Sequence, residues 1–258
     1  MGADRAAYAF IPQLIVSDLS TARGVDVRFV LCDGLSGACD IYRENINPRQ
    51  PISCLECQAK TASTMHELAT PYAWLGTYLD PRVEHEALDF VARLPRHRLL
   101  EAEWDGLPIG AWCSASAHTQ FRAARLEVLD PKVETAVREF LLGTIKVARA
   151  TETLYEVERP DTVALLNGRF FAHWAAIELA ERRGIRWITH ERGLQKDTIR
   201  FARGARLHDL VTNERIWDEW GAVPLSAEEL ERTAQILDER RHGQNYSRLV
   251  FSPPQQDT

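Results

Sequence analysis

The chain has 258 residues, of which 45% are hydrophobic and 26% are charged, and its formal net charge at pH 7 is −6. This length and composition are typical of a globular protein with a substantial core, built as one large domain or two small ones. The negative charge argues against nucleic-acid binding through bulk positive charge, and no apolar run approaches the roughly 18 residues of a membrane span. The N-terminus also lacks the basic and apolar regions of a secretory signal. We therefore expect no nucleic-acid partner, no transmembrane segment and a cytoplasmic location.

Two candidate strands open the chain, Tyr8–Ile15 and Val25–Leu31, and the second alternates apolar and polar residues. The next segment, about residues 32–60, contains prolines, asparagines and four of the five cysteines, and we expect an irregular inserted loop. The pattern that follows is mostly helical, with a turn at Trp104–Pro108. Lys132–Glu158 carries apolar side chains at helical intervals and predicts one long amphipathic helix.

The cysteines of the 32–60 segment have the spacing C-x6-C-x14-C-x2-C and are candidate metal ligands. Four thiolates could close a tetrahedral zinc site, although the first pair is spaced more widely than in most zinc sites. An iron–sulfur cluster uses the same ligands. Free thiols packed as small apolar groups, or a redox or disulfide role, are the alternatives. The candidate metal ligands are Cys32, Cys39, Cys54 and Cys57.

The stretch from residue 161 to residue 197 predicts a βαβ unit. Thr162–Leu166 is an apolar run with the length of a buried parallel strand. Phe170–Arg183 is rich in helix-forming residues, and Gly184 follows it at the position of a helix C-cap. Ile185–Thr189 is the next strand. We therefore expect an α/β protein with a parallel sheet, in which ligands bind at the carboxyl ends of the strands.

Polar residues follow both of these strands and a third strand that ends near residue 31, and we expect all three strands in one sheet. Glu191 or His190 could act as a general base, and Arg192 could bind phosphate or carboxylate through its planar guanidinium. The alternatives are a Glu–Arg pair that only fixes a loop, an Asn167 that only caps the helix, and a plain Asp-Gly turn after the third strand. The candidate catalytic residues are His190 and Glu191, and the candidate substrate-binding residues are Asp33, Gly34, Asn167, Gly168, Arg169, Arg192 and Gly193.

Beyond the βαβ unit, Asp209–Asn213 predicts a last short strand, and Ser226–Arg241 a charged amphipathic helix opened by a capping box. Residues 246–258 are polar and rich in proline, which is typical of a linker or a frayed end. The sequence has no P-loop motif, no nucleophile elbow and no G-x-G-x-x-G after its first strand. A dinucleotide-dependent redox enzyme is therefore disfavoured.

As a set, these motifs resemble the N-terminal half of bacterial capsule polysaccharide biosynthesis proteins. The resemblance spans most of the chain and is strongest at residues 29–58 and 160–198. Those proteins look like glycosyltransferases of the GT-B type, with two Rossmann-like domains that face each other across a cleft. The motifs that carry the resemblance are Cys32-Asp33-Gly34, Cys39, Cys54-x-x-Cys57, Asn167-Gly168-Arg169, His190-Glu191-Arg192-Gly193 and Arg241-x-Gly243-x-Asn245.

The resemblance implies that residues 1–245 form a Rossmann-like acceptor-side domain flanked by helices. It also implies a nucleotide sugar as co-substrate, bound by a second domain that this chain lacks. One hypothesis is therefore a transferase domain of surface-polysaccharide assembly that binds a sugar or glycan acceptor and is incomplete as a single chain. In it, Glu191 or His190 is the base, and Arg169 and Arg192 contact anions or sugar. The alternative is a non-catalytic binding or scaffolding domain, held together by zinc or an iron–sulfur cluster, that partners a separate donor-binding protein.

Overall fold

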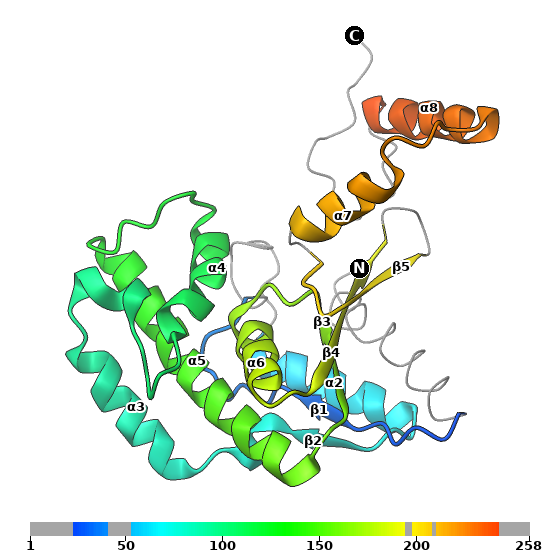
Figure 1. The fold of residues 1–258 in the computed structure, drawn as a ribbon. Helices are drawn as coiled ribbons and strands as arrows, with labels where there is room; N and C mark the ends of the chain where they lie inside the picture. The colour runs from blue at the N-terminus through cyan, green and yellow to red at the C-terminus, as the bar shows by residue number, and fades with distance from the viewer. Residues whose placement is uncertain (1–22, 41–52, 194–197, 208–209, 243–258) are drawn as a thin grey trace.

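The computed structural model describes residues 23–40, 53–193, 198–207 and 210–242, in which helices predominate over two small sheets (Figure 1). The predicted strand Tyr8–Ile15, the motif residues Gly243 and Asn245, and the tail at 246–258 lie outside these ranges. In chain order the elements are β1 (Phe29–Leu31), α2 (Cys54–Glu67), β2 (Tyr72–Trp74), η1 (Leu75–Tyr78), α3 (Pro81–Arg93), η2 (Arg96–Glu101), α4 (Ile109–Phe121), α5 (Pro131–Glu158), β3 (Thr162–Leu166), α6 (Phe171–Arg182), β4 (Arg186–Arg192), β5 (Ile199–Arg203), α7 (Leu210–Trp220) and α8 (Ala227–Arg241).

Helix α5 lies at the centre of the fold, where α3, α4 and α6 pack around it (Figure 1). Asp130 caps the helix by accepting a hydrogen bond from the Lys132 N–H at 2.8 Å, and Pro131 occupies the first turn, where its missing N–H costs nothing. The long helix predicted over Lys132–Glu158 is confirmed. The largest fully buried side chains of the core include Trp112 from α4, Val137, Phe140, Leu141 and Ile145 from α5, and Ile177 and Leu179 from α6.

The three-stranded sheet contains the predicted βαβ unit. β3 and β4 are parallel, with Leu166 opposite His190, and α6 connects them. The α/β class with parallel pairing is therefore confirmed. β1 and β2 form a separate parallel pair, so the prediction that the strand before Asp33 would share one sheet with β3 and β4 is wrong.

β4 is longer than the sequence pattern predicted. It continues through His190 and Glu191 to Arg192, where a loop was expected, because β5 pairs with it in the antiparallel direction. The two strands are joined at their ends by a hydrogen bond from the Gly193 N–H to the Thr198 carbonyl at 2.7 Å. The apparent loop motif is thus mostly strand, which fixes the directions of its side chains.

Two helices replace predicted irregular or extended segments. The first turn of α2 contains Cys54 and Cys57, which were expected in an irregular loop. The helix begins there because Ser53, at the N-cap, forms a capping box with Glu56. The predicted strand at Asp209–Asn213 is wrong, since the chain from residue 210 onward belongs to α7. The predicted C-terminal helix is confirmed as α8, and the Ser226 hydroxyl accepts a hydrogen bond from the Glu229 N–H at 3.2 Å.

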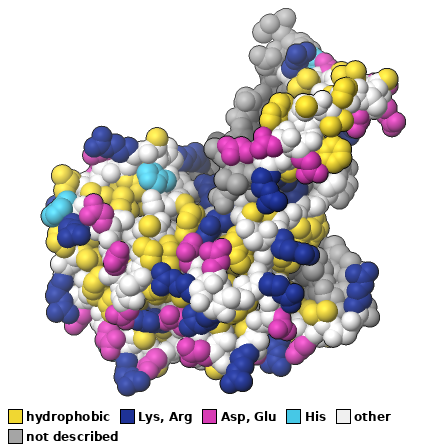
Figure 2. Space-filling view, viewed as in Figure 1, with side chains coloured by type: hydrophobic (Ala, Val, Ile, Leu, Met, Phe, Trp, Pro, Cys, Tyr) yellow, Lys and Arg dark blue, Asp and Glu magenta, His cyan; other side chains and the backbone are white. Residues whose placement is uncertain are grey.

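Helices α7 and α8 extend away from the rest of the molecule and carry exposed apolar side chains (Figures 1 and 2). Trp217 is 72% exposed and Trp220 is 61% exposed. On the face shown in Figure 2, basic and acidic side chains alternate over the helical body. None of the helices in the described ranges is both long enough and apolar enough to cross a membrane.

Candidate functional site

The turn after β3 is tightly constrained. Asn167 and Gly168 have φ angles of 29° and 79°, and Asn167 Oδ1 accepts a hydrogen bond from the Arg169 N–H at 3.0 Å. A Cβ on Gly168 would lie 2.8 Å from Ile177 Cδ1 and 2.9 Å from Arg206 Cγ. Glycine is therefore needed here both for its positive φ and for space. The turn places Arg169 at the carboxyl end of β3.

The Glu191 carboxylate lies beside this turn. Asn167 Nδ2 donates a hydrogen bond to Glu191 Oε2 at 2.8 Å, and the Asn167 N–H donates to the His190 carbonyl at 2.9 Å. Because successive side chains of a strand point to opposite faces, His190 and Glu191 face different sides of the sheet. The structure thus brings Asn167 and Glu191 together and separates Glu191 from His190.

Helix α4 contributes two hydroxyl groups to the same region. Ser116 Oγ accepts a hydrogen bond from the N–H of Phe171, the first residue of α6, at 3.0 Å. Ser116 therefore accepts a hydrogen bond from the first turn of α6. The alternative interpretation of Asn167 as the side-chain cap of α6 is wrong, because Phe170 occupies the N-cap position. Thr119 Oγ1 accepts a hydrogen bond from Arg169 Nη2 at 2.5 Å. The guanidinium is therefore held at the C-terminal end of α4.

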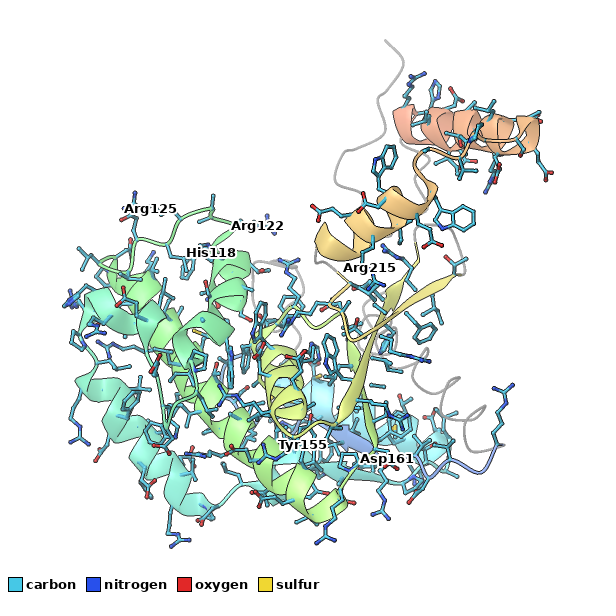
Figure 3. The ribbon with its side chains drawn as sticks, viewed as in Figure 1. His118, Arg122, Arg125, Tyr155, Asp161 and Arg215 are labelled. Atoms are coloured by element: carbon cyan, nitrogen blue, oxygen red, sulfur yellow. The ribbon has the colours of Figure 1, made fainter. Side chains whose placement is uncertain are left out.

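More basic side chains lie around this end of α4. Figure 3 shows His118 on its last turn, with Arg122 and Arg125 in the segment that follows. His118 Nδ1 is hydrogen-bonded to the Ala123 carbonyl at 2.8 Å, and Arg125 pairs with Glu127 at 3.3 Å. His118 therefore makes a local structural contact.

Asp40, in the loop after β1, is an acidic group of this region that no sequence motif marked. Burial raises the pKa of its carboxyl from the ordinary 3.8 to about 6, while a hydrogen bond with Ser116 and the charge of Arg169 act in the opposite direction. Its Oδ1 atom is buried and has no hydrogen-bond partner among the described residues. A carboxyl with this pKa exchanges its proton near neutral pH, which suits a general acid or base.

Two histidines lie on the other side of β4. His190 is 3% exposed, and neither of its ring nitrogens, nor Nδ1 of His173 on α6, has a hydrogen-bond partner in the part of the chain that the structure describes. Burial lowers the pKa of both imidazoles, and the proximity of His190 lowers that of His173 further, to about 4. Glu191 acts in the opposite direction on the pKa of His190. The predicted base His190 is therefore a buried side chain, and Glu191 is the better placed of the two.

Arg206, in the segment after β5, is a second cation near the turn that the sequence did not reveal. Its guanidinium carbon lies 4.1 Å from the ring centroid of Trp174 and 5.8 Å from that of Trp187. Its Nη2 donates a hydrogen bond to Glu178 Oε1 at 2.7 Å. Arg206 therefore contacts both α6 and β4 and links these two elements.

The predicted substrate-binding residues Asp33 and Gly34 belong to a different part of the molecule. Asp33 Oδ2 accepts a hydrogen bond from the Gly76 N–H at 3.1 Å, and its Oδ1 accepts one from the Leu35 N–H at 3.3 Å. Gly34 has a φ of 82°, which agrees with the turn alternative. Asp33 therefore joins the loop after β1 to the segment after β2.

Three of the four candidate metal ligands approach one another at this loop. Burial raises the pKa of the Cys32 thiol, and the nearby thiols of Cys54 and Cys57 raise it further. A Cβ on Gly34 would lie 2.7 Å from Cys54 Sγ. Among the described residues, no three Cys, His, Asp or Glu side chains have an arrangement that would hold a metal ion. A zinc ion or iron–sulfur cluster at these thiols stays a prediction.

The region at the carboxyl ends of β3 and β4, the β3–β4 edge, thus combines three groups. They are the Glu191 carboxylate held by Asn167, the Asp40 carboxyl with its raised pKa, and the Arg169 guanidinium bound to Thr119 of α4. These groups can move a proton and can bind an anion or a polar ligand. Gly193, also predicted to bind substrate, closes the end of β4, and Arg192 is the last residue of that strand. Comparison of the chain with protein-family models, with curated proteins and with solved structures found no match in any of the three.

Proposed function

We propose that this chain is a glycosyltransferase-like domain of bacterial surface-polysaccharide biosynthesis that binds the sugar or glycan acceptor. The observation that carries the proposal is the Glu191 carboxylate, which accepts a hydrogen bond from Asn167 at 2.8 Å at the carboxyl end of two parallel strands. Asn167 belongs to the same turn as Arg169. Ligands bind at this edge in open α/β sheets. The motifs at residues 160–198, which resemble capsule polysaccharide biosynthesis proteins, include all three of these residues.

The chemistry of sugar transfer assigns a role to each group. An acceptor hydroxyl must lose its proton as it attacks the sugar, and a carboxylate such as Glu191 or Asp40 can receive it. The nucleotide leaves with a negative charge, which a fixed guanidinium such as Arg169 stabilises. Because Arg169 is already bound to Thr119, little ordering is needed when an anion binds.

The resemblance places the nucleotide sugar on a second Rossmann-like domain, as in a GT-B enzyme. We propose that a separate protein supplies that domain and that the present chain binds the acceptor. Its partners are then a glycan acceptor and a donor-domain protein. The exposed tryptophans of α7, Trp217 and Trp220, offer apolar surface for such a contact.

Acceptor binding by the purified chain tests this function directly. Calorimetric titration with capsular oligosaccharides should show binding that Glu191→Gln weakens, because the amide cannot accept a proton and hydrogen-bonds differently with Asn167. Glu228→Gln, at an exposed position of α8, is the matched control and should bind like the wild type. Unchanged binding and unchanged sugar transfer in Glu191→Gln would contradict the assignment. Tight binding of a nucleotide sugar by this chain alone would contradict the acceptor role.

A second candidate is a non-catalytic scaffolding domain held together by a metal, because Cys32, Cys54 and Cys57 lie near one another, although the described side chains do not form a metal site as they stand. Cysteine thiols bind zinc only when deprotonated, and burial together with the neighbouring thiols raises the pKa of Cys32. A bound cation would reverse that effect. In this candidate the chain would bind a donor-domain protein, and neither Glu191→Gln nor Asp40→Asn would alter transfer by the assembly.

A further inference from the structure

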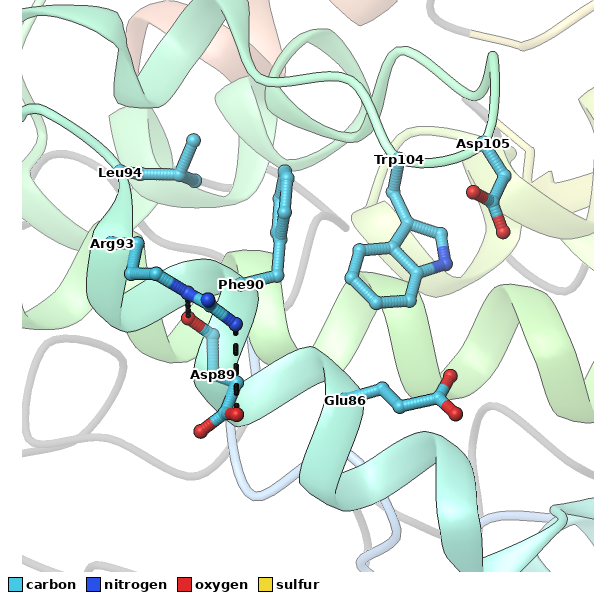
Figure 4. A pocket seen from close by; sticks show the side chains of 7 residues that line it. All are labelled: Glu86, Asp89, Phe90, Arg93, Leu94, Trp104 and Asp105. Carbon is cyan, nitrogen blue, oxygen red and sulfur yellow. Dashed lines mark hydrogen bonds and ion pairs between the residues drawn. The ribbon is translucent and has the colours of Figure 1, made fainter.

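A cavity of about 630 Å³ lies between α3 and the turn before α4, and α5 separates it from the three-stranded sheet (Figures 1 and 4). This volume is within the roughly 300–1,000 Å³ typical of small-molecule sites. The α3 residues that line it are spaced by three or four positions, which places them on one face of the helix. The side chains that carry its chemistry are Glu86, Asp89, Phe90, Arg93, Trp104 and Asp105.

Two aromatic rings form an apolar wall in the cavity. Phe90 and Trp104 pack edge to face with their ring centroids 4.8 Å apart. Trp104 exchanges two backbone hydrogen bonds with Leu107, at 2.9 and 2.8 Å, across the Asp-Gly turn predicted from the sequence. An ion pair between Asp105 and Arg149 of α5 anchors the same turn. The wall is therefore already formed without a ligand.

The polar part of the cavity contains a donor without an acceptor. Trp104 Nε1 is buried and has no hydrogen-bond partner among the residues that the structure describes. Figure 4 shows this nitrogen on the side of the ring that faces the carboxylates of Glu86 and Asp105. Asp89, at the other end, pairs with Arg93 at 3.5 Å. A buried N–H without an acceptor is unfavourable, so a ligand that supplies one gains more than at a solvated site.

A hydroxyl group fits between the indole and the carboxylates, because it accepts a hydrogen bond from the N–H and donates one to a carboxylate. An ammonium ion would leave the N–H without an acceptor, and an anion would be repelled by the carboxylate of Glu86, since Asp89 and Asp105 are already paired with arginines. A sugar ring carries such hydroxyls around apolar C–H faces, which match the aromatic wall. We propose that this cavity binds a neutral saccharide through Trp104, Glu86 and Asp105.

This saccharide site goes beyond the proposed function, since none of its residues belongs to the β3–β4 edge. It would hold a glycan on a second face of the molecule and take no part in proton transfer. Asp40→Asn and Glu191→Gln should therefore leave saccharide binding at the cavity unchanged. That result separates failure of the proposed function from failure of this inference.

Saturation-transfer NMR on the full chain, with maltotriose, cellotriose and diacetylchitobiose as probes, tests the proposal. At least one probe should bind the wild type, and Trp104→Phe, which keeps a ring but removes the N–H, should weaken it about tenfold. Trp220→Phe, at an exposed tryptophan of α7, is the matched control and should bind normally. Glu86→Ala replaces an exposed side chain of the cavity wall, so this variant should fold normally and should also weaken binding. It keeps the test valid if Trp104→Phe folds poorly.

Three outcomes would overturn the saccharide site. One is the absence of binding by all three probes at millimolar concentration. Another is equal binding by the wild type and by folded Trp104→Phe and Glu86→Ala variants. The third is preferential binding of putrescine, an amine cation, which would assign the carboxylates to a cationic ligand instead.

Discussion

Replacement of Asp40 by Asn should stabilise the protein at neutral pH. Asparagine has nearly the shape of the protonated carboxyl but never carries a charge, so its burial costs less free energy than burial of the carboxylate. The pKa of Asp40 in the folded protein is about 6, above the ordinary 3.8, because the carboxyl is buried. Between pH 3.8 and 6 the folded state therefore binds more protons than the unfolded state.

The sign and size of the effect follow from these two pKa values. The stability that Asp40 contributes is fully present below pH 3.8 and is lost as the pH rises through 6. The pKa values differ by about two pH units, each of which corresponds to about 1.36 kcal/mol, so the free energy of unfolding falls by about 3 kcal/mol across this range. Asp40→Asn removes this loss.

Urea unfolding of the wild type and Asp40→Asn at several pH values between about 3 and about 8 measures the effect. The free energy of unfolding of the variant, relative to the wild type, should rise by about 3 kcal/mol over this range. Titration of other groups affects both proteins and cancels in the difference. Ser116→Ala keeps the Asp40 carboxyl but removes a hydrogen bond that lowers its pKa. The loss of stability with rising pH should therefore occur at higher pH in this variant than in the wild type.

A difference that stays constant or falls with rising pH would refute this reasoning. A falling difference is the signature of a carboxylate that the fold stabilises in its charged form, as in a tight ion pair with Arg169. The NMR titration of the Asp40 carboxyl carbon gives an independent midpoint, which should lie near pH 6.

Three further results are expected. The pKa of His173 is lowered from 6.5 to about 4, so its contribution to stability is present above pH 6.5 and is lost as the pH falls through 4. In urea unfolding, His173→Phe should reduce the fall in the free energy of unfolding between these pH values. The same pH dependence in the variant and the wild type would contradict this expectation. Gly168→Ala should destabilise the fold by about 2 kcal/mol more than Gly184→Ala, because both glycines have positive φ but only the first lacks space for a Cβ; equal melting temperatures would exclude the steric cause. Under the scaffold hypothesis, metal analysis should find about one zinc or one iron–sulfur cluster per chain, lost in Cys54→Ser and kept in Cys113→Ala; metal-free wild type would remove that hypothesis.

Local signals in the sequence were enough to locate several elements. The long helix over residues 132–158 follows from apolar spacing, and the start of α8 follows from the Ser226–Glu229 capping box. The βαβ unit follows from two apolar runs separated by a helical pattern that Gly184 ends. Each of these signals acts within a few residues, so it can be interpreted without knowledge of the tertiary structure.

Pairing between distant segments accounts for two of the differences from the sequence-based predictions. β5 extends β4 through residues that resemble a loop motif, and the position of β1 in a separate sheet removes Asp33 from the β3–β4 edge. Strand pairing depends on a partner elsewhere in the chain. The pattern within either strand alone does not specify that partner.

The sequence by itself determined the α/β class and the βαβ unit, and it selected Asn167, Arg169 and Glu191 as candidate site residues. Only the tertiary structure decided that Asn167 holds Glu191, that His190 is buried and that Asp40 carries a raised pKa. The physical reason is that a pKa, or an orphaned donor such as Trp104 Nε1, depends on burial and on partners contributed by other elements. Residue type and spacing identify the groups that can do chemistry, and packing decides which of them are held where they can do it.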